Sequence, residues 1–310
     1  MNKGKTAMKN PTHIKGLIFV IIGASLWGIG GTASDYIFTA TPVDVNWYVT
    51  ARLTISGIIL LSIYTLFFRR KHRTVWNKHT VLMFAVYSIF GMTMVQYTFM
   101  AAIGFGNAAI ATVLQCTGPI YIILYAVMKK YKPWTKAEAL IIAAMIIGVI
   151  LIATNGNLTN LAVSPAALMF GLASGVALAY YTLHAPVLLQ VIHPLQLVGG
   201  SMLTGGILMN FIHPIWVFDF SFDWTAMQVI ILALSILLGT TLAFYLYITS
   251  MKYISSTEAG ILGLLEPVSA VLTSVLLLNV GLGMYQAAGI ILILGVGVFI
   301  STRKAETVQH

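Results

Sequence analysis

Apolar residues fall in long runs separated by short polar segments along almost the whole chain. Each run has about 20 residues, the length at which an α-helix crosses the hydrocarbon core of a bilayer. The pattern predicts helices near residues 16–38, 44–67, 79–103, 107–128, 135–153, 165–190, 194–217, 227–251, 256–279 and 283–301. No gap is long enough for a soluble domain. We therefore predict an all-α integral membrane protein with ten transmembrane helices.

The basic residues predict how these helices are oriented. Every Lys and Arg except Arg52 lies before the first run or in the gaps after the second, fourth, eighth and tenth runs. Positively charged connections stay on the cytoplasmic side, so we expect cytoplasmic tails at 1–15 and 302–310. The 310 residues are 59% hydrophobic and 8% charged, which favours a multi-pass protein of the cell membrane, in a bacterium the inner membrane. The net charge of +9 comes from membrane-flanking groups, so it does not indicate nucleic-acid binding.

The single cysteine, Cys116, lies within an apolar run. One cysteine forms no intramolecular disulfide and no cysteine-based metal site, so we interpret it as a small buried hydrophobe. We expect no metal and no cofactor. The first run has no A-x-A cleavage pattern, so we expect it to remain as a helix.

The two halves of the chain repeat at an offset of 148 residues. The matched pairs are Val81 with Val229, Ala85 with Ala233, Gly91 with Gly239, Thr93 with Thr241, Tyr97 with Tyr245, Ala111 with Ala259, Leu114 with Leu262, Pro119 with Pro267, Leu124 with Leu272 and Ala139 with Ala287. Apolar matches arise easily in this composition, whereas Gly, Thr, Tyr and Pro matches do not. We therefore predict five-helix repeats at 16–153 and 165–301. Because five is odd, the second repeat enters the membrane from the opposite face, as in secondary transporters with inverted repeats.

Two related segments carry a family resemblance: LGLLEPVSAVLTSVLLL at 262–278 and its first-half counterpart VLQCTGPIYIILYAV at 113–127. With the two five-helix halves, they make residues 16–301 resemble the EamA-type branch of the drug/metabolite transporter superfamily. The resemblance implies ten helices around a central cavity, lined by helices one, three, four, six, eight and nine.

An acidic residue is expected near the middle of the membrane. Glu266 lies about ten residues into the ninth run, immediately before Pro267, which cannot donate a backbone hydrogen bond. A carboxyl group beside a loosened helix can take a proton or meet a cationic group. The alternative is a structural acid bonded to neighbouring backbone. The first-half counterpart of Pro267 is Pro119, which follows Gly118 instead of an acid.

Asp35 and Arg52 are two further charged candidates within the runs, near the outer ends of helices one and two. A short hairpin joins these helices, so we expect either a structural ion pair or gating of the external mouth.

The remaining candidates are polar or aromatic residues within the runs. Tyr180, Tyr181 and His184 can cluster on one side of helix six, as a structural group or a proton relay. Residues at the ends of runs are expected at headgroup level: Trp47, Tyr48, Trp134, Trp216 and Trp224. The candidate substrate-binding residues are Trp27, Gln96, Tyr97, Gln115, Tyr180, Tyr181, His184, Thr241, Tyr245 and Glu266, and the candidate coupling or gating residues are Glu266, Asp35, Arg52, Pro119 and Pro267.

The leading hypothesis is a secondary transporter that moves a small metabolite, such as an amino acid, by alternating access. Export is favoured, with proton coupling through Glu266. The chain has no GxxxxGK[ST] loop for ATP hydrolysis. An importer of an organic cation or quaternary amine is the alternative, because aromatic walls around a carboxylate suit such a ligand. A membrane-embedded enzyme is a remote alternative, since it needs convergent acids, histidines or metal ligands. The expected partners are the substrate, the bilayer and protons, in a monomer or homodimer.

Overall fold

The structure, a computed structural model, describes residues 11–302 except 70–73, 75, 132, 219–220, 255–258 and 260–261. Residues 1–10 and 303–310 of the predicted tails therefore lie outside it, as do Arg70, Lys71, Arg73 and Lys132. All regular structure in the described ranges is helical. The elements are α1 (Pro11–Ala40), α2 (Val45–Ile63), η1 (Tyr64–Phe68), α3 (Lys78–Val86), η2 (Tyr87–Thr93), α4 (Met94–Phe105), α5 (Ala108–Gln115), α6 (Gly118–Met128), α7 (Lys136–Thr154), α8 (Pro165–Leu189), α9 (Pro194–Asn210), α10 (Ala226–Ile236), η3 (Leu237–Leu242), α11 (Ala243–Ser250), α13 (Leu265–Leu278) and α14 (Met284–Thr302).

Seven helical stretches in the described chain are long and apolar enough to cross a membrane. They are Thr12–Ala40, Val45–Phe68, Lys78–Phe105, Ala108–Met128, Lys136–Thr154, Pro165–Leu189 and Ala226–Ser250. Leu265–Leu278 and Met284–Ile300 are shorter apolar helices. An all-helical membrane fold is therefore confirmed, whereas ten crossings with cytoplasmic termini stay a prediction.

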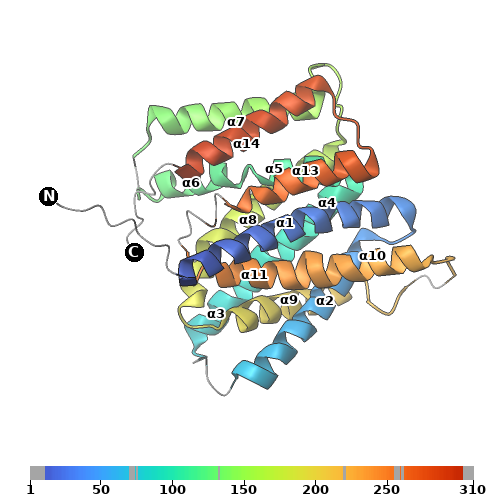
Figure 1. The fold of residues 1–310 in the computed structure, drawn as a ribbon. Helices are drawn as coiled ribbons and strands as arrows, with labels where there is room; N and C mark the ends of the chain where they lie inside the picture. Colours follow the sequence, from blue (N-terminus) through green and yellow to red (C-terminus); the bar gives the residue numbers. More distant parts are fainter. Residues whose placement is uncertain are drawn as a thin grey trace.

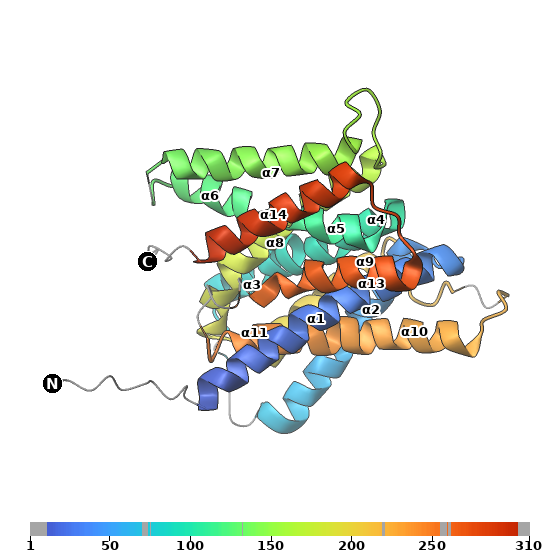
Figure 2. The same ribbon diagram turned by 45° about the horizontal axis from the view of Figure 1, so that its top comes forward.

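Successive helices run back and forth between two sides of the molecule (Figure 1, Figure 2). The start of α1, the end of α6, the start of α7 and the end of α14 lie on one side. The end of α1, the end of α7, the start of α10 and the end of α13 lie on the other. This arrangement is the one expected for a chain that crosses a bilayer repeatedly.

Local sequence signals set several helix ends. Thr135 forms a capping box with Glu138 at the start of α7, and Thr225 forms one with Gln228 at the start of α10. Asn155 and Asn279 end α7 and α13 with positive φ angles of 46° and 52°, a conformation that asparagine tolerates well. The Thr135 and Thr225 side chains satisfy backbone N–H groups that a helix start leaves without partners.

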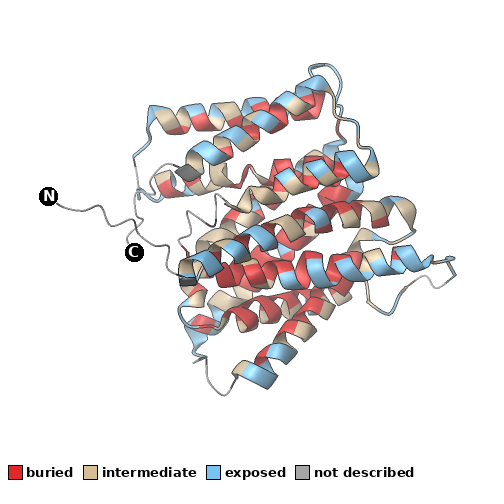
Figure 3. Ribbon diagram, viewed as in Figure 1, coloured by how far each residue is buried: buried red, intermediate tan, exposed pale blue. Residues whose placement is uncertain are grey.

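Helix α1 runs through the middle of the bundle and contacts α13 and α11 (Figure 1). Helix α2 packs on α9, and α4 packs on α8. Helices α7 and α14 form a separate pair, side by side in both views (Figure 1, Figure 2). Buried residues lie where the central helices face one another, whereas exposed positions lie along the outer faces of α7, α14 and α10 (Figure 3). Many exposed positions are apolar, among them Leu140, Ile147, Met227, Val229 and Ile291. Such faces suit lipid contact.

The same irregularity occurs in both halves. The π-helical segments η2 and η3 overlap once the 148-residue offset is applied, and each includes one of the matched glycines, Gly91 or Gly239. Thr93 donates its hydroxyl to the Ser88 carbonyl oxygen at 2.7 Å. Its counterpart Thr241 donates to the Ile236 carbonyl oxygen at 3.0 Å. Each bond reaches back five residues, which matches the wider turn of a π-helix.

Three predicted helices differ in the structure. The run at 107–128 forms two helices, α5 and α6, with Cys116 and Thr117 between them. Pro119 lies in the first turn of α6, where its missing N–H has no helical partner to lose. The predicted helix 194–217 ends at Asn210, because Pro214 cannot continue it. Of the predicted helix 256–279, α13 begins at Leu265, and residues 255–258 and 260–261 lie outside the described residues.

Candidate functional site

A cavity lies between helices of the two halves, and we call it the central cavity. Its volume, counted as the space that the centre of a water molecule can occupy, is about 30 Å³. A single water needs about 10–15 Å³ by this measure. The site therefore has room for water-sized occupants only. Its walls come from α1, α2, α4, α5, α8, η3, α11 and α13. The lining residues are Trp27, Gly31, Arg52, Val95, Gln96, Phe99, Met100, Gln115, Leu178, Tyr181, Gly239, Phe244 and Glu266.

Glu266 is the acid of the central cavity. It lies in the first turn of α13, directly before Pro267. Within the described residues its carboxyl group makes no hydrogen bond or ion pair, while its backbone carbonyl oxygen accepts a hydrogen bond from Ser269 Oγ at 2.9 Å. The close passage of α1 at Gly28 fixes this turn. The carboxyl group is thus held in place through its backbone and is available to a proton or a ligand.

Arg52 is the basic residue of the central cavity, and the expected ion pair with Asp35 is wrong. Arg52 is 4% exposed. Its Nη1 lies 2.6 Å from the Met100 sulfur, and its guanidinium carbon lies 5.4 Å from the centre of the Tyr48 ring. Asp35 instead accepts a hydrogen bond from the Ala108 backbone N–H at 2.9 Å. Asp35 therefore caps the start of α5, where the positive end of the helix favours a carboxylate.

Several buried N–H groups of the cavity residues have no acceptor. Arg52 Nε, Trp27 Nε1 and Gln96 Nε2 are enclosed and lack a hydrogen-bond partner. Gln115 differs, because its Nε2 donates to Ser174 Oγ at 2.6 Å. Buried polar groups normally find partners. Three enclosed N–H donors of the central cavity thus lack acceptors, and the enclosed Tyr181 hydroxyl also lacks a partner.

The comparisons with known proteins fit this arrangement. The EamA-like transporter family matches residues 14–154 and 165–303, which together make up most of the chain. The chain belongs to this family. The resemblance seen in the sequence is therefore confirmed, and this EamA-like protein is a multi-pass membrane transporter rather than an enzyme.

Individual relatives agree with the family assignment. The EamA-like chain is 32% identical over 289 residues to a Salmonella typhimurium protein named "Uncharacterized inner membrane transporter YicL", covering 93% of this chain and 95% of the relative. A solved structure described as "Crystal structure of protein" matches with a TM-score of 0.60 and 17% identity, over 96% of this chain and 99% of that one. At that identity the second likeness concerns the fold alone.

The structure brings together five of the sequence candidates and separates five others. Trp27, Gln96, Gln115, Tyr181 and Glu266 line the central cavity. The five that do not line it are Tyr97, Tyr180, His184, Thr241 and Tyr245.

All five of these separated residues have contacts of their own. Tyr97 meets Phe170 edge to face, with ring centres 5.9 Å apart. Tyr180 and His184 stack at 4.1 Å, and His184 Nδ1 lies 2.9 Å from the Tyr180 carbonyl oxygen. The stacked pair leaves Tyr181 on another side of α8, because consecutive residues of a helix do not share a face. A hydrogen bond of 2.7 Å joins Thr241 Oγ1 to Ser56 Oγ and so links η3 to α2. Tyr245 packs against the main hydrophobic core.

The remaining cavity residues gave little signal in the sequence. Val95, Phe99, Met100, Leu178 and Phe244 are apolar residues within apolar runs, so nothing distinguishes them from lipid-facing or core positions. Gly239 is the exception, because it is a repeat partner of Gly91. No group of three or more His, Cys, Asp or Glu residues able to hold a metal ion occurs within the described ranges.

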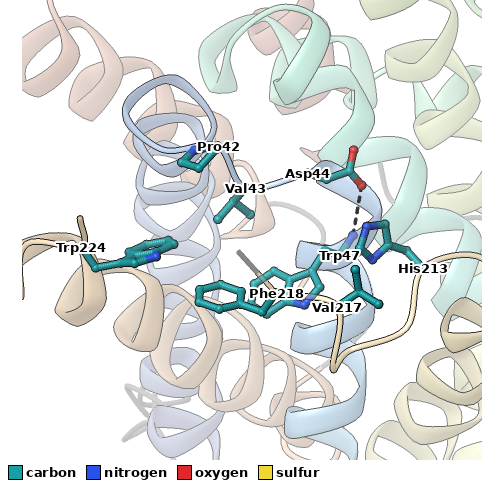
Figure 4. A pocket seen from close by; sticks show the side chains of 8 residues that line it. All are labelled: Pro42, Val43, Asp44, Trp47, His213, Val217, Phe218 and Trp224. Atoms are coloured by element: carbon teal, nitrogen blue, oxygen red, sulfur yellow. Dashed lines mark hydrogen bonds between the residues drawn. The ribbon is translucent and has the colours of Figure 1, made fainter. Parts of the chain in front are cut away.

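A second pocket of about 170 Å³ lies beside the α1–α2 connection (Figure 4). Its walls are Pro42, Val43, Asp44, Trp47, His213, Val217, Phe218 and Trp224. Asp44 Oδ1 accepts hydrogen bonds from the backbone N–H groups of Asn46 and Trp47, so this carboxylate caps α2. The central cavity, with both Arg52 and Glu266, is therefore the stronger candidate for the substrate site.

The expectation of headgroup contact is wrong for Trp47 and Tyr48. Trp47 is 9% exposed, and its Nε1 donates to the Ile215 carbonyl oxygen at 2.8 Å. Tyr48 is fully buried, with its hydroxyl 2.7 Å from Ser235 Oγ. Their position at the end of an apolar run does not reveal that the segment after α9 covers Trp47 and that α10 contacts Tyr48. Trp134 and Trp216 are exposed.

Proposed function

We propose that this EamA-like protein is a secondary transporter that carries a small amphipathic metabolite, such as an amino acid, by alternating access. In this proposal the chain crosses the membrane ten times, as inverted repeats at 16–153 and 165–301 with cytoplasmic termini. The supporting observation is the central cavity, which helices of both halves enclose around Glu266 and Arg52. A site between repeats is what alternating access requires. In this proposal the cavity widens when the substrate enters.

The interrupted helices support the same mechanism. Pro119 and Pro267, partners in the repeat, each lie in the first turn of a helix, α6 or α13. In secondary transporters, helices broken near the midplane present backbone groups and helix ends to the substrate and the coupling ion. Pro119 and Pro267 are therefore proposed to let α6 and α13 tilt when the site opens.

Proton coupling through Glu266 is the energetic part of the proposal. In proteoliposomes, substrate movement is expected to depend on an imposed pH gradient, and Glu266→Gln is expected to abolish that dependence. Asp223→Asn is the control, because it removes an exposed carboxylate from the connection before α10. A pH dependence unchanged in Glu266→Gln would falsify coupling through this residue.

The substrate class is found first by thermal unfolding of the purified protein with amino acids, amines and nucleosides, since a ligand of the folded state raises stability. Stabilisation by amino acids is expected. An imported organic cation is disfavoured because it would share the central cavity with the Arg52 guanidinium. Stabilisation by amines alone would reverse this preference. Export is kept as the favoured direction by resemblance to the amino-acid exporters of the superfamily. Release of the substrate by cells that produce the protein would test it.

A further inference from the structure

We infer that Arg52 is the carboxylate-binding residue of the central cavity, so that the substrate class is a molecule bearing a carboxylate group. The inference rests on the proposed function and adds the group by which the substrate is recognised. The observation behind it is a buried guanidinium on a cavity wall whose charge no acidic side chain of the described chain neutralises.

The contacts of Arg52 leave its charge without a counterion. The sulfur of Met100 is a weak acceptor with no charge, and the Tyr48 ring lies beside the guanidinium as a neutral face. Asp35 is engaged with the backbone of Ala108. Glu266 lies on the α13 wall of the same cavity and forms no ion pair with Arg52. A buried charge is normally paired, and here an anionic ligand can supply the missing partner.

The unpaired neighbours of Arg52 point to the same kind of ligand. Trp27 Nε1 and Arg52 Nε are donors that cannot act as acceptors. The Nε2 group of Gln96 adds a third enclosed donor without a partner. A ligand that satisfies these groups must present acceptor atoms, and the two oxygens of a carboxylate match the fork of an arginine.

Glu266 can bind a second charged group of the same substrate. A molecule that places its carboxylate on Arg52 can direct an ammonium group towards Glu266, on a different wall. This arrangement suits the two charged groups of an amino acid. It disfavours simple amines, which lack a partner for Arg52, and simple carboxylic acids, which lack one for Glu266.

The inference is tested by thermal unfolding of the purified full-length protein with matched probes: L-alanine, L-leucine and L-phenylalanine against their amides, and acetate against acetamide. Wild type is expected to be stabilised by at least one of the amino acids and not by its amide. In Arg52→Met the apparent affinity for that amino acid is expected to fall by about 10- to 100-fold. Arg69→Met is the matched control, because Arg69 is exposed at the end of η1. The affinity of this variant for the same amino acid is expected to stay at the wild-type level.

The ligand-free proteins give a second readout that does not depend on the probe. If the charge of Arg52 lacks a partner, Arg52→Met unfolds at a higher temperature than wild type in the absence of ligand, because an apolar side chain replaces an uncompensated buried charge. A purely structural arginine gives the opposite sign. Arg52→Lys keeps the charge without the planar fork, so it should retain preference for the acid over the amide with reduced affinity.

Three results would overturn the inference: equal stabilisation of wild type by acids and amides, an Arg52→Met variant that still prefers the acid, or stabilisation of wild type by none of the acids. If the proposed function itself were wrong, the result would differ. Proteoliposomes with the wild-type protein would then move no substrate, and no gradient-dependent flux could be compared with that of Glu266→Gln.

Discussion

Adding one methyl group at Gly28 tests the close passage of α1 over the first turn of α13. A Cβ atom there would collide with Ser269 Oγ, the Glu266 carbonyl oxygen and the Ala270 backbone nitrogen, the last at 2.7 Å. Two of these atoms belong to the backbone, so no side-chain rotation relieves the collision. The two helices must move apart, and the turn that carries Glu266 moves with them.

The expected magnitude follows from a comparison with Gly31, three residues further along α1. A Cβ atom at Gly31 would lie 3.7 Å from the Phe99 ring, an ordinary contact. Both Gly→Ala changes gain roughly 1 kcal/mol of helix propensity, which cancels in the comparison. Overpacking at Gly28 should leave Gly28→Ala about 1–3 kcal/mol less stable than Gly31→Ala. At roughly 2 °C per kcal/mol, its unfolding temperature is then about 2–6 °C lower.

The assay is thermal unfolding of both variants, purified side by side in the same detergent. Transport by Gly28→Ala should also fall, because Glu266 is displaced. Equal unfolding temperatures for the two variants would refute the close contact between α1 and α13, and with it the position given to the Glu266 turn.

Further predictions concern buried polar contacts. Asp35→Ala leaves the Ala108 N–H without its acceptor and should lower the free energy of unfolding by about 1–3 kcal/mol. Asp35→Asn keeps an acceptor oxygen, so its free energy of unfolding should fall less. Equal losses of stability in the two variants, measured by thermal unfolding, would argue against the cap. Thr241→Val removes the bond to Ser56 and should destabilise by about 1 kcal/mol. Thr39→Val is the control, because Thr39 is exposed and its hydroxyl bonds only to the backbone of its own helix. Its free energy of unfolding should stay within about 0.5 kcal/mol of wild type. A loss of stability as large as that of Thr241→Val would contradict the role of the Ser56 contact.

The sequence predicts the fold class well because hydrophobic run length and basic-residue placement are strong signals in a membrane protein. It also predicts that Glu266 lies within the membrane, from its distance to the ends of its run, and this depth stays a prediction. What it cannot predict is the rotation of each helix about its own axis. Tyr180 and Tyr181 illustrate this, because they are neighbours in sequence and only Tyr181 lines the central cavity.

Arg52 shows a second limit of prediction from the sequence: the sequence does not determine which of several possible partners a polar side chain contacts. Its distance from the end of helix two made Asp35 a reasonable partner. The structure gives Asp35 a different role, because the first N–H groups of α5 also need acceptors. Competition of this kind depends on which helix end lies beside which side chain, and that is known only once the helices are assembled.

The wide turns η2 and η3 bear on how closely the two halves correspond. A π-helical turn holds one residue more than the α-helix around it, so gaining one in a single half would change the offset between the halves by one. The offset is 148 before these segments, at Val81 and Val229, and still 148 after them, at Tyr97 and Tyr245. The two halves therefore keep the same length through these segments, so the wide turn of one half is matched by the wide turn of the other.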